Sequence, residues 1–146
     1  MEPMVFNVVR VVGVEPGAEL DGTVYDQWVQ IDHSGSRFSV FDHMLIMPEH
    51  SAGELHEVKL SFMATAVTPE RVAHSGVAGN VFSGEVVNVL ENGDSFNHII
   101  DVNGLKVHLL EDEKHPVGQY LEIRGRLDLD DMHYPSAEAW EPAGFD

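Results

Sequence analysis

Polar and apolar residues alternate along most of the chain. Positions two apart carry valine, isoleucine, leucine or phenylalanine, and the positions between them carry charged or hydroxyl side chains. A period of two is typical of β-strands that bury one face, and β-branched residues are enriched in strands. The pattern predicts an all-β protein of about eight antiparallel strands. We expect these strands near residues 4–15, 23–32, 37–47, 56–67, 82–91, 95–102, 105–111 and 120–129.

Short turn sequences separate several of the expected strands. Asn92-Gly93 and Asn103-Gly104 tolerate the positive φ angles of tight hairpins, and Ser34-Gly35 takes the matching place in the first half. Each half of the chain is therefore expected to form two hairpins.

The last expected strand indicates which face is buried. Leu121, Ile123, Leu127 and Leu129 fall on one side, and charged residues fall on the other. Gly125 on the apolar side predicts a bend or a close approach of another backbone. One apolar and one polar face are typical of a closed or nearly closed antiparallel barrel with a solvated exterior.

Three blocks of sequence occur twice, in the same order. The paired blocks are residues 5–17 and 81–93, residues 31–42 and 100–111, and residues 53–59 and 118–124. We interpret them as a tandem duplication of one small β unit. Because a unit of about 70 residues is marginally stable alone, the two halves are expected to share a core.

The expected domain organisation follows this repeat. Residues 1–67 form the first β repeat, residues 68–79 a joint and residues 80–129 the second β repeat. Residues 130–146 are expected to form an acidic tail that is flexible in solution.

Composition narrows the classes of function. The 146 residues include no cysteine, so a disulfide framework and a thiolate zinc site are excluded. The formal charge of -17, from 25 acidic and 8 basic residues, repels nucleic acid and anionic lipid. No apolar stretch approaches the ~20 residues that span a bilayer, and the chain does not open with a signal peptide. We expect a cytoplasmic protein with no membrane partner.

The acidic surface also suggests a source. Lysine occurs at only three positions, Lys59, Lys106 and Lys114. An acidic, lysine-poor surface suits molar salt, where the Debye length is ~3 Å and self-repulsion is screened. A salt-loving source is one hypothesis, and an ordinary acidic protein is the other.

Two resemblances add to this interpretation. The stretch from Gly84 to Leu127 resembles an oligonucleotide-binding (OB) fold, because Val117-Gly118-Gln119-Tyr120 followed by Gly125-Arg126-Leu127 has the rhythm of the strand after that barrel's helix. Extended through the repeat, the resemblance implies one closed or partly open OB-like barrel built from two four-stranded repeats.

The chain is also similar in outline to the small eighth subunit shared by eukaryotic RNA polymerases. The parallels are the turn Val14-Glu15-Pro16-Gly17, the strand from Gly53 to Phe62 and the hairpin Val102-Asn103-Gly104-Leu105. In that family two four-stranded halves merge into one barrel, which serves assembly and has no active site. The resemblance therefore implies an RNA-polymerase-associated subunit.

Five of the eight basic residues occupy related, outward strand positions. They are Arg37, Lys59, Lys106, Arg124 and Arg126. They are candidates for a binding stripe for a partner or for single-stranded nucleic acid. The alternative is pairing with nearby carboxylates such as Glu57, Glu122 and Asp128, which is favoured and is worth ~0.2–1 kcal/mol per pair.

Nine histidines raise the question of a metal site. The tightest group is His50, Glu54 and His56, whose imidazole and carboxylate ligands would suit zinc, nickel or copper, although their spacing matches no strong motif. His98 shares a strand face with Phe96 and Ile100, so a hydrogen-bonded structural histidine is expected there.

Catalytic signatures are missing from the sequence. Ser75-Gly76 and Ser83-Gly84 lack the surrounding glycines of a nucleophile elbow, and no glycine-rich phosphate loop occurs. We predict a non-catalytic protein-interaction or assembly module without a cofactor, which binds a protein partner or a multi-subunit complex. The first alternative is an OB-like protein that binds single-stranded nucleic acid. The second is a small metal-binding protein.

Overall fold

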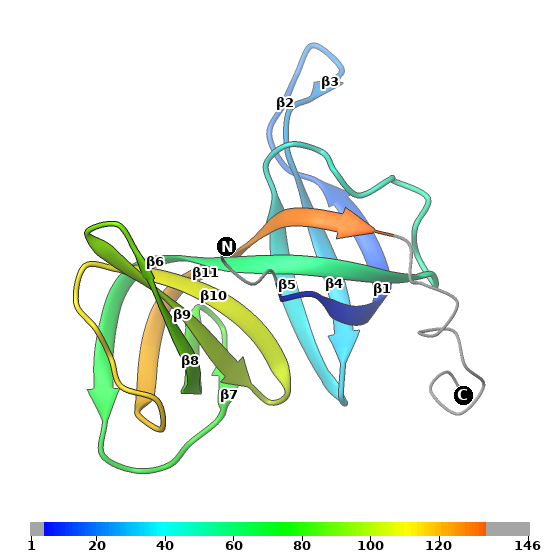
Figure 1. The fold of residues 1–146 in the computed structure, drawn as a ribbon. Coiled ribbons are helices and arrows are strands. Elements are labelled where there is room, and N and C mark those ends of the chain that lie inside the picture. Colours follow the sequence, from blue (N-terminus) through cyan, green and yellow to red (C-terminus); the bar gives the residue numbers. More distant parts are fainter. Residues whose placement is uncertain (1–4, 134–146) are drawn as a thin grey trace. The chain divides into compact units, whose positions relative to one another are not determined.

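The structure, a computed structural model, describes residues 5–133 and is all-β over that range (Figure 1). No helix occurs within these residues, and so none that would be long and apolar enough to cross a membrane. The eleven strands are β1 (Asn7–Pro16), β2 (Glu19–Leu20), β3 (Thr23–Val24), β4 (Gln27–His33), β5 (Ser36–Asp42), β6 (Leu55–Glu70), β7 (Gly76–Ala78), β8 (Val81–Asn92), β9 (Ser95–Val102), β10 (Leu105–Glu111) and β11 (Tyr120–His133).

The prediction of an all-β protein is confirmed. The eight expected strands correspond to β1, β4, β5, β6, β8, β9, β10 and β11, and the short strands β2, β3 and β7 are additional. One expected strand is too long: β5 ends at Asp42, and residues 43–54 form a loop in place of the strand predicted as far as residue 47. The pairing of β10 with β6 is parallel, at His108 and Ser61, which departs from the expected antiparallel arrangement.

Nine of the strands form one sheet, and the hydrogen-bonded strand pairs within it close two rings. The order is β1-β4-β5-β11-β6-β10-β9-β8-β7, with the additional pairings β1–β6 and β8–β11. The first additional pairing closes a ring of β1, β4, β5, β11 and β6. The second closes a ring of β6, β10, β9, β8 and β11. Strands β2 and β3 form a separate two-stranded hairpin.

The chain divides into two compact units, and each ring belongs to one of them. Among the described residues, the amino-terminal unit holds residues 6–59 and 129–133, and the central unit holds residues 5 and 60–128. This division differs from the expected repeat boundaries at residues 67 and 80. The physical reason is that the long strands β6 and β11 each supply residues to both rings, so the chain passes between units in mid-strand.

Each unit buries its own apolar side chains. The buried set in the amino-terminal unit is Val9, Val11, Val29, Ile31, Phe38, Val40, Met47, Leu55, Val58 and Leu129. The buried set in the central unit is Leu60, Phe62, Phe82, Val86, Ile99, Ile100, Val102, Leu105, Val107, Leu109, Leu121, Ile123 and Leu127. The predicted inward face of the last strand is thereby confirmed.

The turn predictions agree with the backbone. Both residues of Ser34-Gly35 and of Asn103-Gly104 have positive φ angles, and Gly93 has a φ of 63°. Gly125 has a φ of 149°, and a Cβ built there would collide with the carbonyl oxygen of Met63, as the predicted close approach requires.

The carboxyl-terminal prediction is wrong for its first residues. Strand β11 continues to His133, so residues 130–133 are part of a strand and not of a tail. Residues 134–146, the rest of the expected tail, lie outside the described residues.

Candidate functional site

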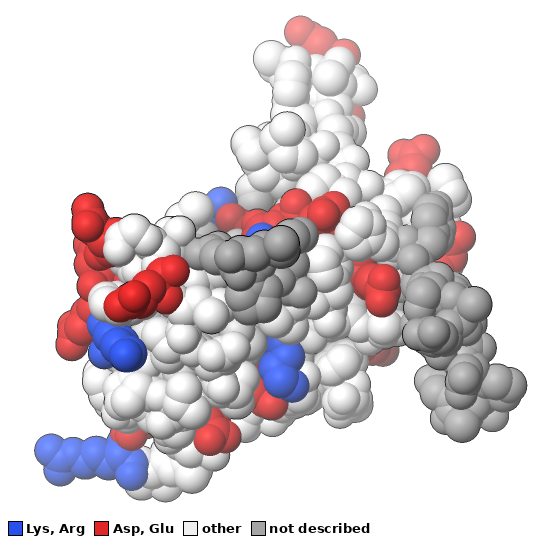
Figure 2. Space-filling view, in the orientation of Figure 1, with Lys and Arg blue, Asp and Glu red and all other residues white. Residues whose placement is uncertain are grey.

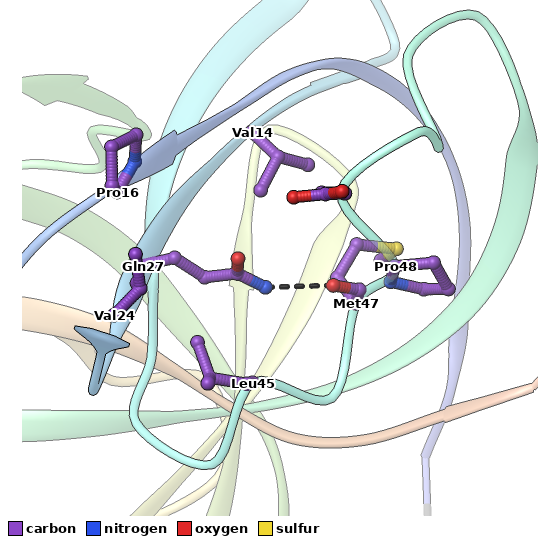
Figure 3. A pocket seen from close by; sticks show the side chains of 8 residues that line it. Val14, Pro16, Val24, Gln27, Leu45, Met47 and Pro48 are labelled. Atoms are coloured by element: carbon purple, nitrogen blue, oxygen red, sulfur yellow. Dashed lines mark hydrogen bonds between the residues drawn. The ribbon is translucent and has the colours of Figure 1, made fainter. Parts of the chain in front are cut away.

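A pocket of about 350 Å³ lies within the amino-terminal unit (Figure 3). Strand β1 supplies Val14 and Pro16 at its end, and the hairpin and the start of β4 supply Val24 and Gln27. The loop that follows β5 supplies the remaining lining. The eight lining residues are Val14, Pro16, Val24, Gln27, Leu45, Met47, Pro48 and Glu49. Six of them are apolar, which suits the binding of an apolar group.

A buried carboxylate holds the loop after β5 in place. Asp42 Oδ1 accepts a hydrogen bond from the backbone nitrogen of Ile46 at 2.8 Å. Asp42 Oδ2 accepts a second from the backbone nitrogen of Met47, also at 2.8 Å. Two hydrogen bonds from successive backbone nitrogens to one side chain close the turn. Leu45 has a φ of 55°, an uncommon angle for leucine, and these hydrogen bonds span it.

The side-chain amide of Gln27 connects the same carboxylate to the pocket. Its nitrogen Nε2 donates to Asp42 Oδ2 at 2.8 Å and to the carbonyl oxygen of Met47 at 2.7 Å. The second bond is drawn in Figure 3. The loop is therefore fixed to β4 as well as to β5.

The β2–β3 hairpin is held at its base. Asp26 Oδ1 accepts a hydrogen bond from the backbone nitrogen of Ala18 at 2.6 Å, and the nitrogen of Gly17 donates to the Asp26 carbonyl at 2.9 Å. Asp21 and Gly22 make the tip, with φ angles of 52° and 81°. Figure 1 shows the hairpin extending beyond the ends of β1 and β4.

Large apolar side chains are exposed on these two segments. Leu20 and Tyr25 on or beside the hairpin are 62% and 55% exposed, and Met44 and Leu45 in the loop are 72% and 41% exposed. Leu45 also lines the pocket, and the other three lie on the segments that supply its lining. Exposed apolar residues gathered on neighbouring segments are typical of an interaction surface.

The same segments carry only negative charge. Glu15, Glu19, Asp21, Asp26 and Glu49 lie in them, and neither lysine nor arginine occurs in residues 11–36 or 38–58. In Figure 2 acidic atoms cover the tip of the hairpin, where no basic atoms are seen. We call the pocket, the exposed side chains and these carboxylates the hairpin site.

The structure places each of the five predicted basic residues beside a carboxylate. Two of the pairs join strands at directly opposed positions, Arg37 with Asp32 and Lys106 with Asp101. The pairs, with their nitrogen-to-oxygen distances, are Arg37–Asp32 (2.8 Å), Lys59–Asp130 (3.9 Å), Lys106–Asp101 (3.2 Å), Arg124–Glu122 (3.3 Å) and Arg126–Asp128 (2.7 Å). Arg37 and Lys59 belong to the amino-terminal unit and the others to the central unit.

The Arg37 pair is the best formed of the five. Its guanidinium nitrogens Nε and Nη2 contact the two oxygens of Asp32 at 2.8 and 3.1 Å. This hydrogen bonding lowers the pKa of Asp32 and raises that of Arg37. Two of the three guanidinium nitrogens are thereby engaged, which leaves fewer donors for a phosphate.

Two of the three predicted metal ligands come together. His56 is buried and its Nε2 lies 3.0 Å from Glu54 Oε1, whereas His50 is exposed in the preceding loop. Within residues 5–133 no three histidine, aspartate or glutamate side chains are grouped so that they could hold a metal ion.

The prediction for His98 is confirmed. His98 is buried, its Nδ1 lies 3.1 Å from the carbonyl oxygen of Leu109, and its Nε2 accepts a hydrogen bond from the backbone nitrogen of His115 at 2.9 Å. Because a backbone nitrogen can only donate, the proton of the neutral imidazole is on Nδ1. Burial lowers the pKa of His98.

Sequence reasoning missed Gln27, Asp42 and the exposed residues of the hairpin site. One signal was present: the apolar run Met44-Leu45-Ile46-Met47 directly follows Asp42, a residue that commonly accepts hydrogen bonds from the turn after it. The apolar pattern of this run instead predicts the end of a strand. Comparison of the chain with models of protein families, with curated proteins and with solved structures finds no match.

Proposed function

We propose that the protein is a non-catalytic interaction or assembly module that binds a protein partner through the hairpin site. The observation that carries this proposal is a mostly apolar pocket lined in part by the exposed Leu45. The two segments that build it carry three further exposed apolar side chains and are held by hydrogen bonds. Interfaces are enriched in aromatic residues and methionine, and Tyr25 and Met44 provide both. A surface that is already ordered loses little conformational entropy on binding.

The fold that we propose for this module is a duplicated, OB-like barrel. Both rings have five strands, which is the number in an OB fold. Both first strands, β1 and β8, change register after a valine, Val11 in β1 and Val86 in β8. The match is one residue earlier than the sequence blocks give, since residues 5–17 and 81–93 pair Val11 with Val87. The shifts lie between Val11 and Gly13 and between Val86 and Asn88.

Backbone hydrogen bonds support the same proposal. Val11 donates to the carbonyl of Glu54 and accepts from the nitrogen of Gly53, at 2.9 and 2.7 Å. Val86 makes the equivalent pair of bonds with residues 119 and 118, both at 2.8 Å. The two rings also share a cross-strand ion pair at directly opposed positions of a hairpin, Asp32 with Arg37 in one ring and Asp101 with Lys106 in the other. An assembly role within an RNA polymerase is the more specific form of this proposal, and it rests on the sequence resemblance.

Affinity co-purification from the native cell, at native salt and with a nuclease-treated control, tests the proposed function. We expect a protein partner that survives nuclease treatment and is lost from the variant Leu45→Asp. Aspartate tolerates the positive φ of residue 45, so this variant should fold. The matched control is Val117→Asp, an exposed valine of the central unit. Partners that disappear with nuclease would overturn the proposal in favour of nucleic-acid binding.

A further inference from the structure

The hairpin site also indicates what kind of protein segment it binds. We infer, on the basis of the proposed function, that the pocket takes one apolar side chain from a partner segment in which the neighbouring residues are lysine or arginine. Three properties of the hairpin site support this inference: the size of the pocket, the sign of the surrounding charge and the hydrogen bonds that hold its walls.

The size of the pocket limits what can enter it. Ligand pockets span about 300–1,000 Å³, and about 350 Å³ is at the small end of that range. Such a volume is large enough to admit an apolar side chain such as leucine, methionine or phenylalanine. Val14, Val24 and Leu45 provide apolar walls for it, so an apolar side chain that enters the pocket is removed from water against apolar surface.

Charge selects the residues on either side of that anchor. Glu49 lines the pocket itself, and Glu15 follows directly after Val14. Asp26 borders the hairpin, whose strand β2 begins with Glu19. With neither lysine nor arginine in the segments that build the site, a basic segment is attracted and an acidic one is repelled. A second copy of this chain, at a formal charge of -17, is a poor occupant for the same reason.

Hydrogen bonds within the chain hold both walls of the pocket. Asp42 and Gln27 hold the loop on one side, and Asp26 holds the hairpin on the other. Binding therefore does not require these segments to fold, and the site can discriminate between segments by shape and charge.

Fluorescence polarisation with short labelled peptides tests the inference. The probe has a central leucine with two lysines on each side. One control peptide replaces the lysines with glutamate, and the other replaces the leucine with serine. We expect the probe to bind the 146-residue protein, and each control peptide to bind at least about tenfold more weakly. Affinity for the probe should fall as salt is raised, because exposed charges are screened.

Protein variants locate the binding. Leu45→Asp and Glu49→Lys should each weaken probe binding by about tenfold or more, whereas the matched controls Val117→Asp and Glu91→Lys should leave it unchanged. Equal binding of the serine peptide, equal binding of the glutamate peptide or an equal effect of the control variants would each overturn the inference.

Two further outcomes keep this test separate from that of the proposed function. If no peptide binds while co-purification still recovers a protein partner that depends on Leu45, the inference about the segment is wrong and the proposed function stands. If the protein alone dimerises, and Leu45→Asp abolishes the dimer in light scattering, the occupant is a second copy and the inference is also overturned.

Discussion

Gln27 and Asp42 are directly opposed on neighbouring strands β4 and β5, and a buried hydrogen bond of 2.8 Å joins Gln27 Nε2 to Asp42 Oδ2. The carboxylate also accepts the backbone nitrogens of Ile46 and Met47. One side-chain pair thus shapes the loop that lines the pocket, although neither side chain is exposed.

We expect Asp42→Asn to reduce the free energy of unfolding by about 2 kcal/mol. The substitution replaces one accepting oxygen with an amide nitrogen, which would then face the backbone or Gln27 donors that now bind that oxygen. Urea unfolding measures this change. The matched control is Gln30→Ala, which removes an exposed hydrogen bond to Ser39 between the same two strands and should change stability by less than about 0.5 kcal/mol. Equal effects of the two substitutions would mean that the buried pair does not hold the loop.

Gly125→Ala should be among the most destabilising single-methyl additions in the chain. Its φ of 149° disfavours any side chain, and the new Cβ would collide with the carbonyl oxygen of Met63. We expect a loss of at least about 2 kcal/mol, measured by urea unfolding. Gly13→Ala is the control, since no atom lies within 4 Å of a Cβ at that position. A small effect at Gly125 would show that β6 and β11 do not approach each other so closely.

The buried His98 should make stability depend on pH below neutrality. Its pKa is lowered in the folded state, whereas the unfolded chain has the ordinary histidine value of about 6.5. The contribution of neutral His98 to the free energy of unfolding is therefore fully present above about pH 6.5. As the pH falls below that value, this contribution is lost by at most about 1.4 kcal/mol per pH unit.

Urea unfolding at a series of pH values measures this dependence. In the variant His98→Gln, the free energy of unfolding should change less steeply with pH below about pH 6.5. The reduction in slope should correspond to at most one bound proton. Two hydrogen bonds, to Leu109 and from His115, hold the neutral form in the folded protein. An unchanged slope would mean that His98 is protonated equally in both states.

The two rings should keep the halves of the chain together after a cut. Strands β6 and β11 each supply residues to both rings, so neither ring is complete without both halves. A protease site introduced between Ala73 and His74, in an exposed loop, allows the cut to be made in the folded protein. We expect both fragments to elute together in gel filtration and to separate only in denaturant. Separation under native conditions would contradict the described pairing.

The sequence predicts the strands and turns well because their signals are local. Alternation places Leu121, Ile123 and Leu127 on the buried face. The turns at Ser34-Gly35 and Asn103-Gly104 use residue types that tolerate the positive φ angles found there. These features depend on neighbours within a few positions.

The division into units and the hairpin site depend on contacts between distant positions, which alternation does not encode. β6 is continuous from Leu55 to Glu70, and only its partners reveal that it belongs to two rings. The apolar residues 44–47 fit a strand pattern, but the pairing of Asp42 with Gln27, 15 positions away, makes a loop of them. The candidate site could therefore not be located from the pattern alone.

Site-specific photocrosslinking in the native cell tests the central claim most directly. A photoreactive phenylalanine analogue replaces Tyr25 or Leu45 in the hairpin site, or Val72 or Val117 in the central unit. The two control positions are 71% and 62% exposed, so they are at least as accessible to a partner as the test positions. We predict one dominant protein adduct from Tyr25 and Leu45, unchanged by nuclease, and none from the controls. Adducts from all four positions alike, or adducts to nucleic acid, would contradict a protein-docking role for the hairpin site.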